Sequence, residues 1–131
     1  EALEAITLGV ASVLTYAGVH ITKAAVDRDR PLGALIDTTG SSFPSGHAAY
    51  SVFWVAAAVA ILRVFPSLLH RAAVVTVAIA IAAFIGLSRV YLRAHYLSDV
   101  LAGWGLGASL FALSGTVVLL VSFFRQNRRP S

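Results

Sequence analysis

Four long apolar runs set the strongest limit on what this chain can fold into. They cover roughly residues 5–21, 48–64, 72–87 and 100–124, and polar stretches separate them. A helix that crosses a bilayer needs about 17–25 mostly apolar residues, and a helix satisfies its own backbone hydrogen bonds in lipid. The two middle runs are short, so each needs a turn from the polar residues beside it. We predict an all-α, polytopic transmembrane bundle with about four membrane-spanning helices.

The composition agrees with burial in lipid. Hydrophobic residues make up 58% of the 131 residues and charged residues 12%, whereas soluble domains carry roughly 25% charged residues. The length fits a single domain, residues 1–131. The net charge of +4 is not arranged as one solvated basic stripe, so we expect no nucleic-acid partner. The chain begins at Glu1 and contains no Met, so we expect an excised or processed piece of a longer protein.

Three polar stretches interrupt the apolar pattern. They are KAAVDRDRP at residues 23–31, PSGH at residues 44–47 and SRVYLRAHYLSD at residues 88–99. In a four-helix bundle the first stretch follows helix one, the second opens helix two, and the third joins helix three to helix four. All three therefore emerge on the same membrane face. Ionisable residues in membrane segments are candidates for function.

The basic residues of these stretches suit a phosphate ligand. Lys23, Arg30 and Arg89 are cations, and a guanidinium binds phosphate oxygens through a two-pronged fork. Lys23 and Arg30 are seven positions apart, so they share a face if the helix continues until Pro31 ends it. The alternative is that these side chains only extend to the membrane surface. The presence of all three stretches favours the phosphate site.

The second stretch has the pattern of a helix start. Ser45 is a natural N-cap, and Gly46 allows a ligand to approach the backbone closely. The free N–H groups and the positive end of the helix dipole favour an anion there. Ordinary capping would explain Ser45 but leaves His47 unexplained.

The third stretch pairs a histidine with a carboxylate. His95 and Asp99 are four positions apart, which makes them neighbours on one face of a helix. A carboxylate bonded to one imidazole nitrogen fixes the tautomer and makes the other nitrogen a better nucleophile or base. A purely structural histidine–aspartate bond is the alternative. Ser88 and Arg89 lie two turns earlier, within reach of the same pocket.

Two other patterns carry no site. The glycines of residues 103–108 loosely fit a dinucleotide motif, but no strand precedes them. Gly103 and Gly107 instead predict a small-residue face for close helix packing. His20 and His70 have no partner at metal-ligand spacing, so we assign both to the membrane interface and predict no metal site.

Taken together, Lys-x6-Arg-Pro, Pro-Ser-Gly-His and Ser-Arg-x5-His-x3-Asp resemble the signature of the type 2 phosphatidic acid phosphatase (PAP2) superfamily. That superfamily also contains the vanadium haloperoxidases and some bacterial acid phosphatases. The three motifs in order are specific, although each alone is weak, and they run from Lys23 to Asp99. The resemblance implies a PAP2/haloperoxidase-like core and a phosphatase that needs no metal or other cofactor. Integral members typically carry six helices, and members often have Gly where this chain has Arg93 and Pro where it has Leu97.

The resemblance also implies roles for individual residues. His95 would be the nucleophile that forms a phosphohistidine, Asp99 would orient it, and His47 would protonate the leaving group and then activate water. The phosphoryl oxygens would be held by Lys23, Arg30, Ser45, Gly46, Arg89 and Ser88.

The charge balance predicts the orientation in the membrane. The face with the polar stretches carries Lys23, Arg28, Arg30, Arg89 and Arg93, and the opposite face carries Arg63, Arg71, Arg125, Arg128 and Arg129. If a ligand holds three of the first five, the positive-inside rule places both termini in the cytoplasm and the site outside.

We therefore predict a lipid phosphate phosphatase of a bacterial inner membrane with lipids as its partners. An outward site suits undecaprenyl diphosphate; phosphatidylglycerophosphate, phosphatidic acid and lipid A phosphates are the close alternatives. A vanadate-holding haloperoxidase would use the same cations, but those enzymes are soluble. The non-enzymatic alternative is a membrane module that binds lipid phosphates without turnover.

Overall fold

The computed structural model describes residues 2–127 and contains four long α-helices in that range. They are α1 (Ala2–Val26), α2 (Gly46–Ala60), α3 (Leu68–Tyr91) and α4 (Leu97–Asn127), and a short 3-10 helix, η1 (Leu62–Val64), extends α2. Each of α1, α3, α4 and the segment Gly46–Val64 is long and apolar enough to cross a membrane. The predicted all-α transmembrane bundle is confirmed. Arg128 and Arg129, which entered the charge balance, lie outside the described residues.

Serine caps begin two of the helices. The Ser45 side chain accepts a hydrogen bond from the Ala48 N–H at the start of α2, as predicted. Ser67 caps α3 in the same way by accepting from the His70 N–H. Each cap satisfies a backbone donor that has no partner within its helix.

The end of α1 differs from the prediction. The helix stops at Val26 and does not continue to Pro31, because Asp27 adopts a left-handed conformation with φ of 43°. Aspartate tolerates this region better than most residues, and the residue before a proline is pushed toward extended structure. Arg30 therefore lies in a loop, and it does not share a helix face with Lys23.

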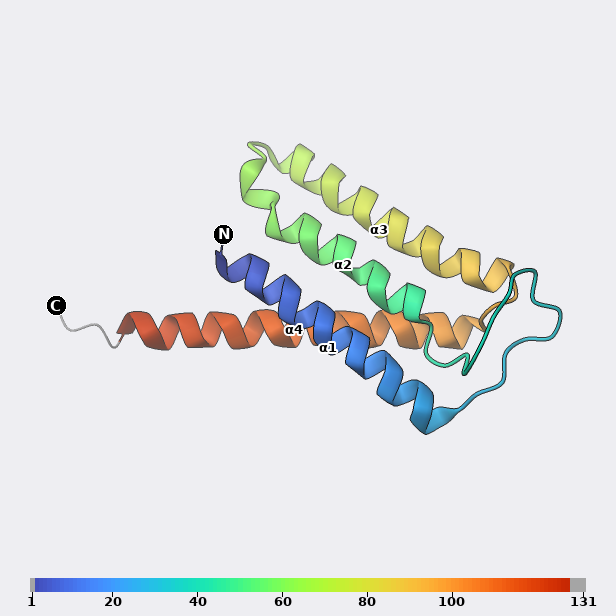
Figure 1. The fold of residues 1–131 in the computed structure, drawn as a ribbon. Helices are drawn as coiled ribbons and strands as arrows, with labels where there is room; N and C mark the ends of the chain where they lie inside the picture. The colour runs from blue at the N-terminus through green and yellow to red at the C-terminus, as the bar shows by residue number, and fades with distance from the viewer. Residues whose placement is uncertain (1, 128–131) are drawn as a thin grey trace.

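The other three helices pack around α2, which contacts α3 and α4, while α1 lies against α4 and α2 (Figure 1). The predicted small-residue face of α4 makes a close contact with the backbone of α2. A Cβ atom on Gly103 would overlap the carbonyl oxygen of Ser45, and one on Gly107 would lie 2.6 Å from the carbonyl oxygen of Ala49. The backbones of α2 and α4 therefore touch directly. This contact holds the start of α2 beside the start of α4, where the Ser45 N–H donates to the Asp99 carbonyl at 2.9 Å.

The three polar stretches meet at one end of the bundle. The connection between α1 and α2 and the connection between α3 and α4 lie together there, while the turn between α2 and α3 lies at the opposite end (Figure 1). The Leu35 N–H donates to the Leu92 carbonyl at 3.0 Å and ties the two connections together. Because successive membrane helices alternate in direction, the parity of the chain already predicted this convergence.

Candidate active site

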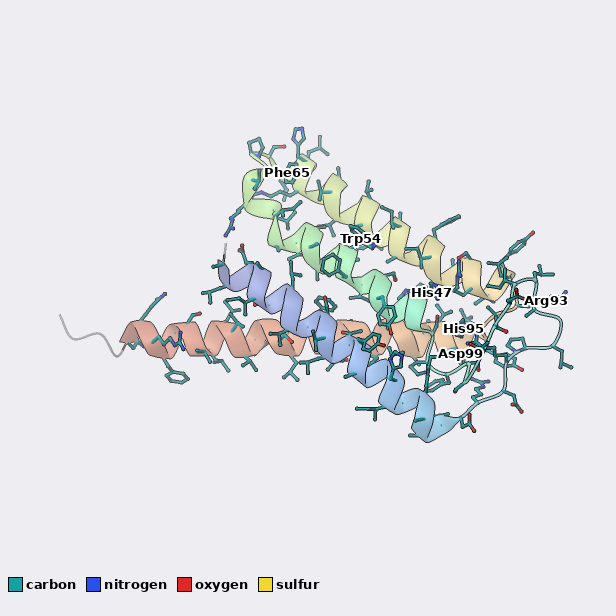
Figure 2. All side chains as sticks on the ribbon, in the orientation of Figure 1. His47, Trp54, Phe65, Arg93, His95 and Asp99 are labelled. Atoms are coloured by element: carbon teal, nitrogen blue, oxygen red, sulfur yellow. The ribbon has the colours of Figure 1, made fainter. Side chains whose placement is uncertain are left out.

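A cavity of about 410 Å³ lies where the polar stretches converge. Six of the predicted site residues line it: Lys23, Arg30, Gly46, His47, Arg89 and His95. Three do not, namely Ser45, Ser88 and Asp99. Figure 2 shows His47 at the start of α2 and His95 near the start of α4, at the same end of the bundle. The fold thus brings together residues from α1, α2, α3 and two connections.

Lys23 and Arg30 are oriented by uncharged acceptors. Lys23 Nζ donates to the Ser41 carbonyl at 2.5 Å. The Arg30 guanidinium donates to the carbonyls of Thr39, at 2.8 Å, and Ala94, at 2.9 Å. Among the described residues no carboxylate lies within ion-pair distance of either side chain. Their positive charges are held in place without being neutralised, which favours an anion in the cavity.

Arg89 lies on the last turn of α3 and is the third cation of the cavity. Its Nε donates to Ser88 Oγ at 3.3 Å, and Ser88 Oγ donates to the Ile85 carbonyl at 2.7 Å. Ser88 therefore contacts Arg89, which lines the cavity, but Ser88 itself does not line it.

The serine and glycine at the start of α2 differ in their access to the cavity. The Ser45 hydroxyl is fully buried and serves as the N-cap. Gly46, the first residue of α2, lines the cavity together with the exposed side chain of His47. The N-terminal end of a helix of this length presents free N–H groups and positive potential to the cavity.

His95 lies in the turn that precedes α4. It is 4% exposed, and its Nδ1 is 2.7 Å from the carbonyl oxygen of Ser42. A carbonyl only accepts hydrogen bonds, so Nδ1 carries the proton and Nε2 has a free lone pair. Nε2 lies 3.5 Å from Nη1 of Arg30, at the cavity. Burial, with the nearby charges of Arg30 and Lys23, lowers the pKa of His95 below its usual 6.5, although the bond to Ser42 acts in the opposite direction.

Asp99 does not make the predicted hydrogen bond to His95. Because His95 precedes α4 and Asp99 lies in its first turn, the two are not on one helical face. Asp99 Oδ2 lies 3.6 Å from His95 Nδ1, longer than a hydrogen bond, and accepts from the Tyr96 N–H at 2.8 Å. Oδ1 accepts from Arg28 at 2.8 Å. The fully buried carboxylate thus has two other partners, and the Ser42 carbonyl accepts the hydrogen bond from the imidazole.

Sequence reasoning missed part of the cavity wall. His20, which we assigned to the membrane interface, lines the cavity beside Tyr16, and their ring centroids are 4.1 Å apart. Tyr50 from α2 completes this side. Helical spacing could have indicated the two α1 residues, because His20 is three positions and Tyr16 seven positions before Lys23. No pattern in the sequence indicated the loop residues of the wall: Ile36, Asp37, Thr38 and Thr39.

The fold and the cavity define an integral membrane protein with a cavity lined by three cations at one end of its helical bundle. The model of the PAP2 superfamily matches residues 4–128, and the chain belongs to this superfamily.

Two bacterial proteins are similar to this chain. It is 35% identical over 109 residues to the Bacillus subtilis (strain 168) protein named phosphatidylglycerophosphatase B, and the match covers 81% of this chain and 54% of the relative. The crystal structure of a transmembrane PAP2 type phosphatidylglycerolphosphate phosphatase from Bacillus subtilis matches with a TM-score of 0.72 and 30% sequence identity. That match covers 98% of this chain and 60% of the other. The chain therefore spans less than two thirds of the length of either protein.

Proposed function

We propose that this protein is a lipid phosphate phosphatase that acts through a phosphohistidine and without a metal ion. The observation that carries the proposal is the position of His95, whose unprotonated Nε2 lies at the wall of a cavity with three cations. Phosphoryl transfer depends on positioning and on neutralising charge more than on elaborate covalent chemistry. Lys23, Arg30 and Arg89 supply that charge where other phosphotransfer enzymes use magnesium.

The first step forms the bond between His95 Nε2 and phosphorus. The lone pair of Nε2 attacks, the bond from phosphorus to the leaving oxygen breaks, and its electron pair stays on that oxygen. The imidazolium of His47 gives the oxygen a proton. The Ser42 carbonyl keeps the Nδ1 proton of His95 in place throughout.

The second step releases phosphate. Neutral His47 takes a proton from water while the water oxygen attacks phosphorus. The bond between phosphorus and Nε2 breaks, and its electron pair returns to the His95 ring. Both histidines then have their starting protonation states, so the cycle needs no other reactant than water.

An apolar pocket beside the cavity supports a lipid substrate. Tyr16 and Tyr50 line both the cavity and a second pocket of about 340 Å³, which Phe53, Trp54 and Phe111 also line. This pocket lies within the membrane-spanning parts of α1, α2 and α4. We infer that the phosphate occupies the cavity while the hydrocarbon chain lies along the stacked pair of tyrosines in the apolar pocket.

Two substrates are the leading candidates. Phosphatidylglycerophosphate is favoured by the names of the two similar Bacillus subtilis proteins. Undecaprenyl diphosphate is favoured by the charge balance, which predicts a site on the outer face of a bacterial inner membrane. Phosphatidic acid and lipid A phosphates have the same headgroup chemistry.

Phosphate release from detergent-purified protein tests the reaction. We expect release from at least one of the lipids in the presence of EDTA. His95→Ala should reduce the rate by about three decades or more, because it removes the nucleophile. His70→Ala, at the opposite end of the bundle, is the matched control and should have the rate of the unmodified protein. Thermal unfolding of both variants checks that they fold. Near-normal turnover by His95→Ala would contradict the proposal.

The orientation can be tested separately, because the chain contains no cysteine. Leu32→Cys places a thiol in the exposed connection at the site end, and Leu68→Cys places one at the opposite end. We expect an impermeant maleimide to label only the first in intact cells. Labelling of only the second would show that the site faces the cytoplasm.

A further inference from the structure

Arg28 lies outside the predicted phosphate-binding set, yet it binds both groups that face the Nδ1 side of His95. Its Nη1 donates to Asp99 Oδ1 at 2.8 Å. Its backbone carbonyl accepts from the Ser42 N–H at 2.8 Å. The carbonyl of that serine in turn accepts from His95 Nδ1. One residue therefore holds the hydrogen-bond acceptor of the imidazole and the carboxylate behind it.

The Arg28 side chain is held on several sides. Its Nη1 also donates to Ser98 Oγ at 2.8 Å, and its guanidinium carbon lies 4.4 Å from the centre of the Tyr96 ring. Asp99 is fully buried, and a buried carboxylate is strongly destabilising unless it is paired. The Arg28 guanidinium thus supplies the charged partner of this buried carboxylate.

Arg28 does not line the cavity, whereas Lys23, Arg30 and Arg89 do. It follows directly after Asp27, whose left-handed backbone turns the chain at the end of α1. This turn gives Arg28 and Arg30 different partners, since the first bonds to Asp99 and the second bonds to loop carbonyls. The two arginines therefore serve different purposes although they are two positions apart.

We propose that Arg28 is a positioning residue, whose guanidinium holds Asp99 beside the imidazole so that His95 keeps its proton on Nδ1 and its lone pair directed at the phosphate. Its backbone carbonyl also holds Ser42, and a side-chain substitution leaves that bond in place. The inference rests on the proposed phosphatase reaction. Because Arg28 does not contact the cavity, its loss should affect the attack by His95 and not the binding of the lipid.

The electrostatic consequence is specific. The charged and titratable groups around His95 are Lys23 from α1, Arg30 and Asp37 from the α1–α2 connection and Asp99 from α4. Arg89, His47 and His20 also line the cavity. Removing the Arg28 charge leaves Asp99 unpaired 3.6 Å from Nδ1. An unpaired carboxylate stabilises the protonated imidazole, so the acid limb of kcat/KM should move to higher pH.

The test compares Arg28→Gln and Arg28→Lys with Arg93→Gln, a control that removes an exposed cation from the same end of the bundle. We expect Arg28→Gln to reduce kcat by about one to two decades, the range reported for outer partners that orient a functional histidine. KM should change by no more than about twofold, as for a loss felt only in the transition state, and the acid limb should rise. Arg28→Lys should return the acid limb of kcat/KM toward its original pH. Arg93→Gln should leave kcat and the acid limb unchanged.

The double variant Arg28→Gln with Asp99→Asn provides a second measurement, because it contains no unpaired buried charge. We expect its kcat to equal that of Asp99→Asn alone, since both changes disturb the same support of His95. This comparison applies even if Arg28→Gln alone does not fold.

Several outcomes would overturn the inference. An unchanged kcat and pH profile in Arg28→Gln would do so, as would a raised KM at constant kcat, which indicates a substrate contact. Strictly additive losses in the double variant would also contradict it. An unmodified protein that hydrolyses none of the lipids contradicts the proposed function and this inference with it, whereas an active one with an unaffected Arg28→Gln contradicts only the inference.

Discussion

The two ends of the bundle use arginine in opposite ways. At the end away from the cavity, Arg63 binds the Glu4 carboxylate with both prongs of its guanidinium, at 2.7 Å and 2.6 Å. At the site end, Arg30 is bound by the carbonyls of Thr39, Gly40 and Ala94. Both side chains are well oriented, but only Arg63 has its charge neutralised.

The presence or absence of a neutralising carboxylate distinguishes an arginine with a structural role from one whose charge can still bind a ligand. A carbonyl dipole orients a guanidinium without cancelling its charge, whereas a carboxylate does both. The cost of holding several uncompensated cations together is reduced when a phosphate enters between them. At the site end, Lys23 and Arg30 therefore keep charges that no carboxylate of the described residues neutralises within ion-pair distance.

Arginine removal at each end tests the comparison and should have the largest effect. Arg30→Gln should lower kcat/KM by about two to three decades, the loss expected for one stabilising donor of the transition state. Arg63→Gln should leave kcat/KM unchanged and lower the free energy of unfolding by up to about 1 kcal/mol, as for a surface ion pair. Steady-state kinetics and thermal unfolding in detergent provide the two measurements. Equal kinetic losses in both variants would show that the ends do not differ as described.

Glycine substitution sharpens the comparison through packing and should have a smaller effect. A Cβ on Gly103, at the site end of α4, would overlap the Ser45 carbonyl, whereas one on Gly115 would meet open space. We expect Gly103→Ala to destabilise the protein by about 1–3 kcal/mol and to lower activity, because the start of α2 with His47 must shift. Gly115→Ala should be neutral or stabilising by up to about 1 kcal/mol. The free energy of unfolding in detergent gives the comparison, and a stable, fully active Gly103→Ala would refute the proposed close contact.

The pH dependence should show the smallest change. Burial and the uncompensated cations lower the pKa of His95 from 6.5, so the acid limb of kcat/KM should lie below that pH. The unfolded chain then binds a proton at higher pH than the folded protein, and the stability contributed by neutral His95 is lost as the pH falls from about 6.5. Arg30→Gln should move the limb upward, and Arg63→Gln should not. A limb above 6.5 in the unmodified protein would contradict this account.

Apolar periodicity and helix-capping patterns predicted the positions of the helices well. They predicted the helix ends and the contacts between side chains less well. The apolar runs predicted the helices, Ser45 the start of α2, and Gly103 with Gly107 the close packing of α4, which is against α2. The expected continuation of α1 to Pro31 was wrong, because Asp27 ends the helix. Placing His95 and Asp99 on one helical face was also wrong, because α4 begins at Leu97. Element boundaries at turns depend on conformations that residue spacing does not reveal.

The sequence by itself determined the class of fold, the family and the convergence of the polar stretches at one end of the bundle. Apolar length, helix caps and chain parity are local or nearly local properties, so one sequence is enough to predict them. Only the tertiary structure decided that Ser42 accepts the proton of His95, that Arg28 pairs with Asp99, and that His20 belongs to the cavity. These contacts join segments that the α1–α2 connection brings together. Which partner lies beside a given carbonyl or guanidinium depends on the path of the backbone. That path is not specified by the types of the residues alone.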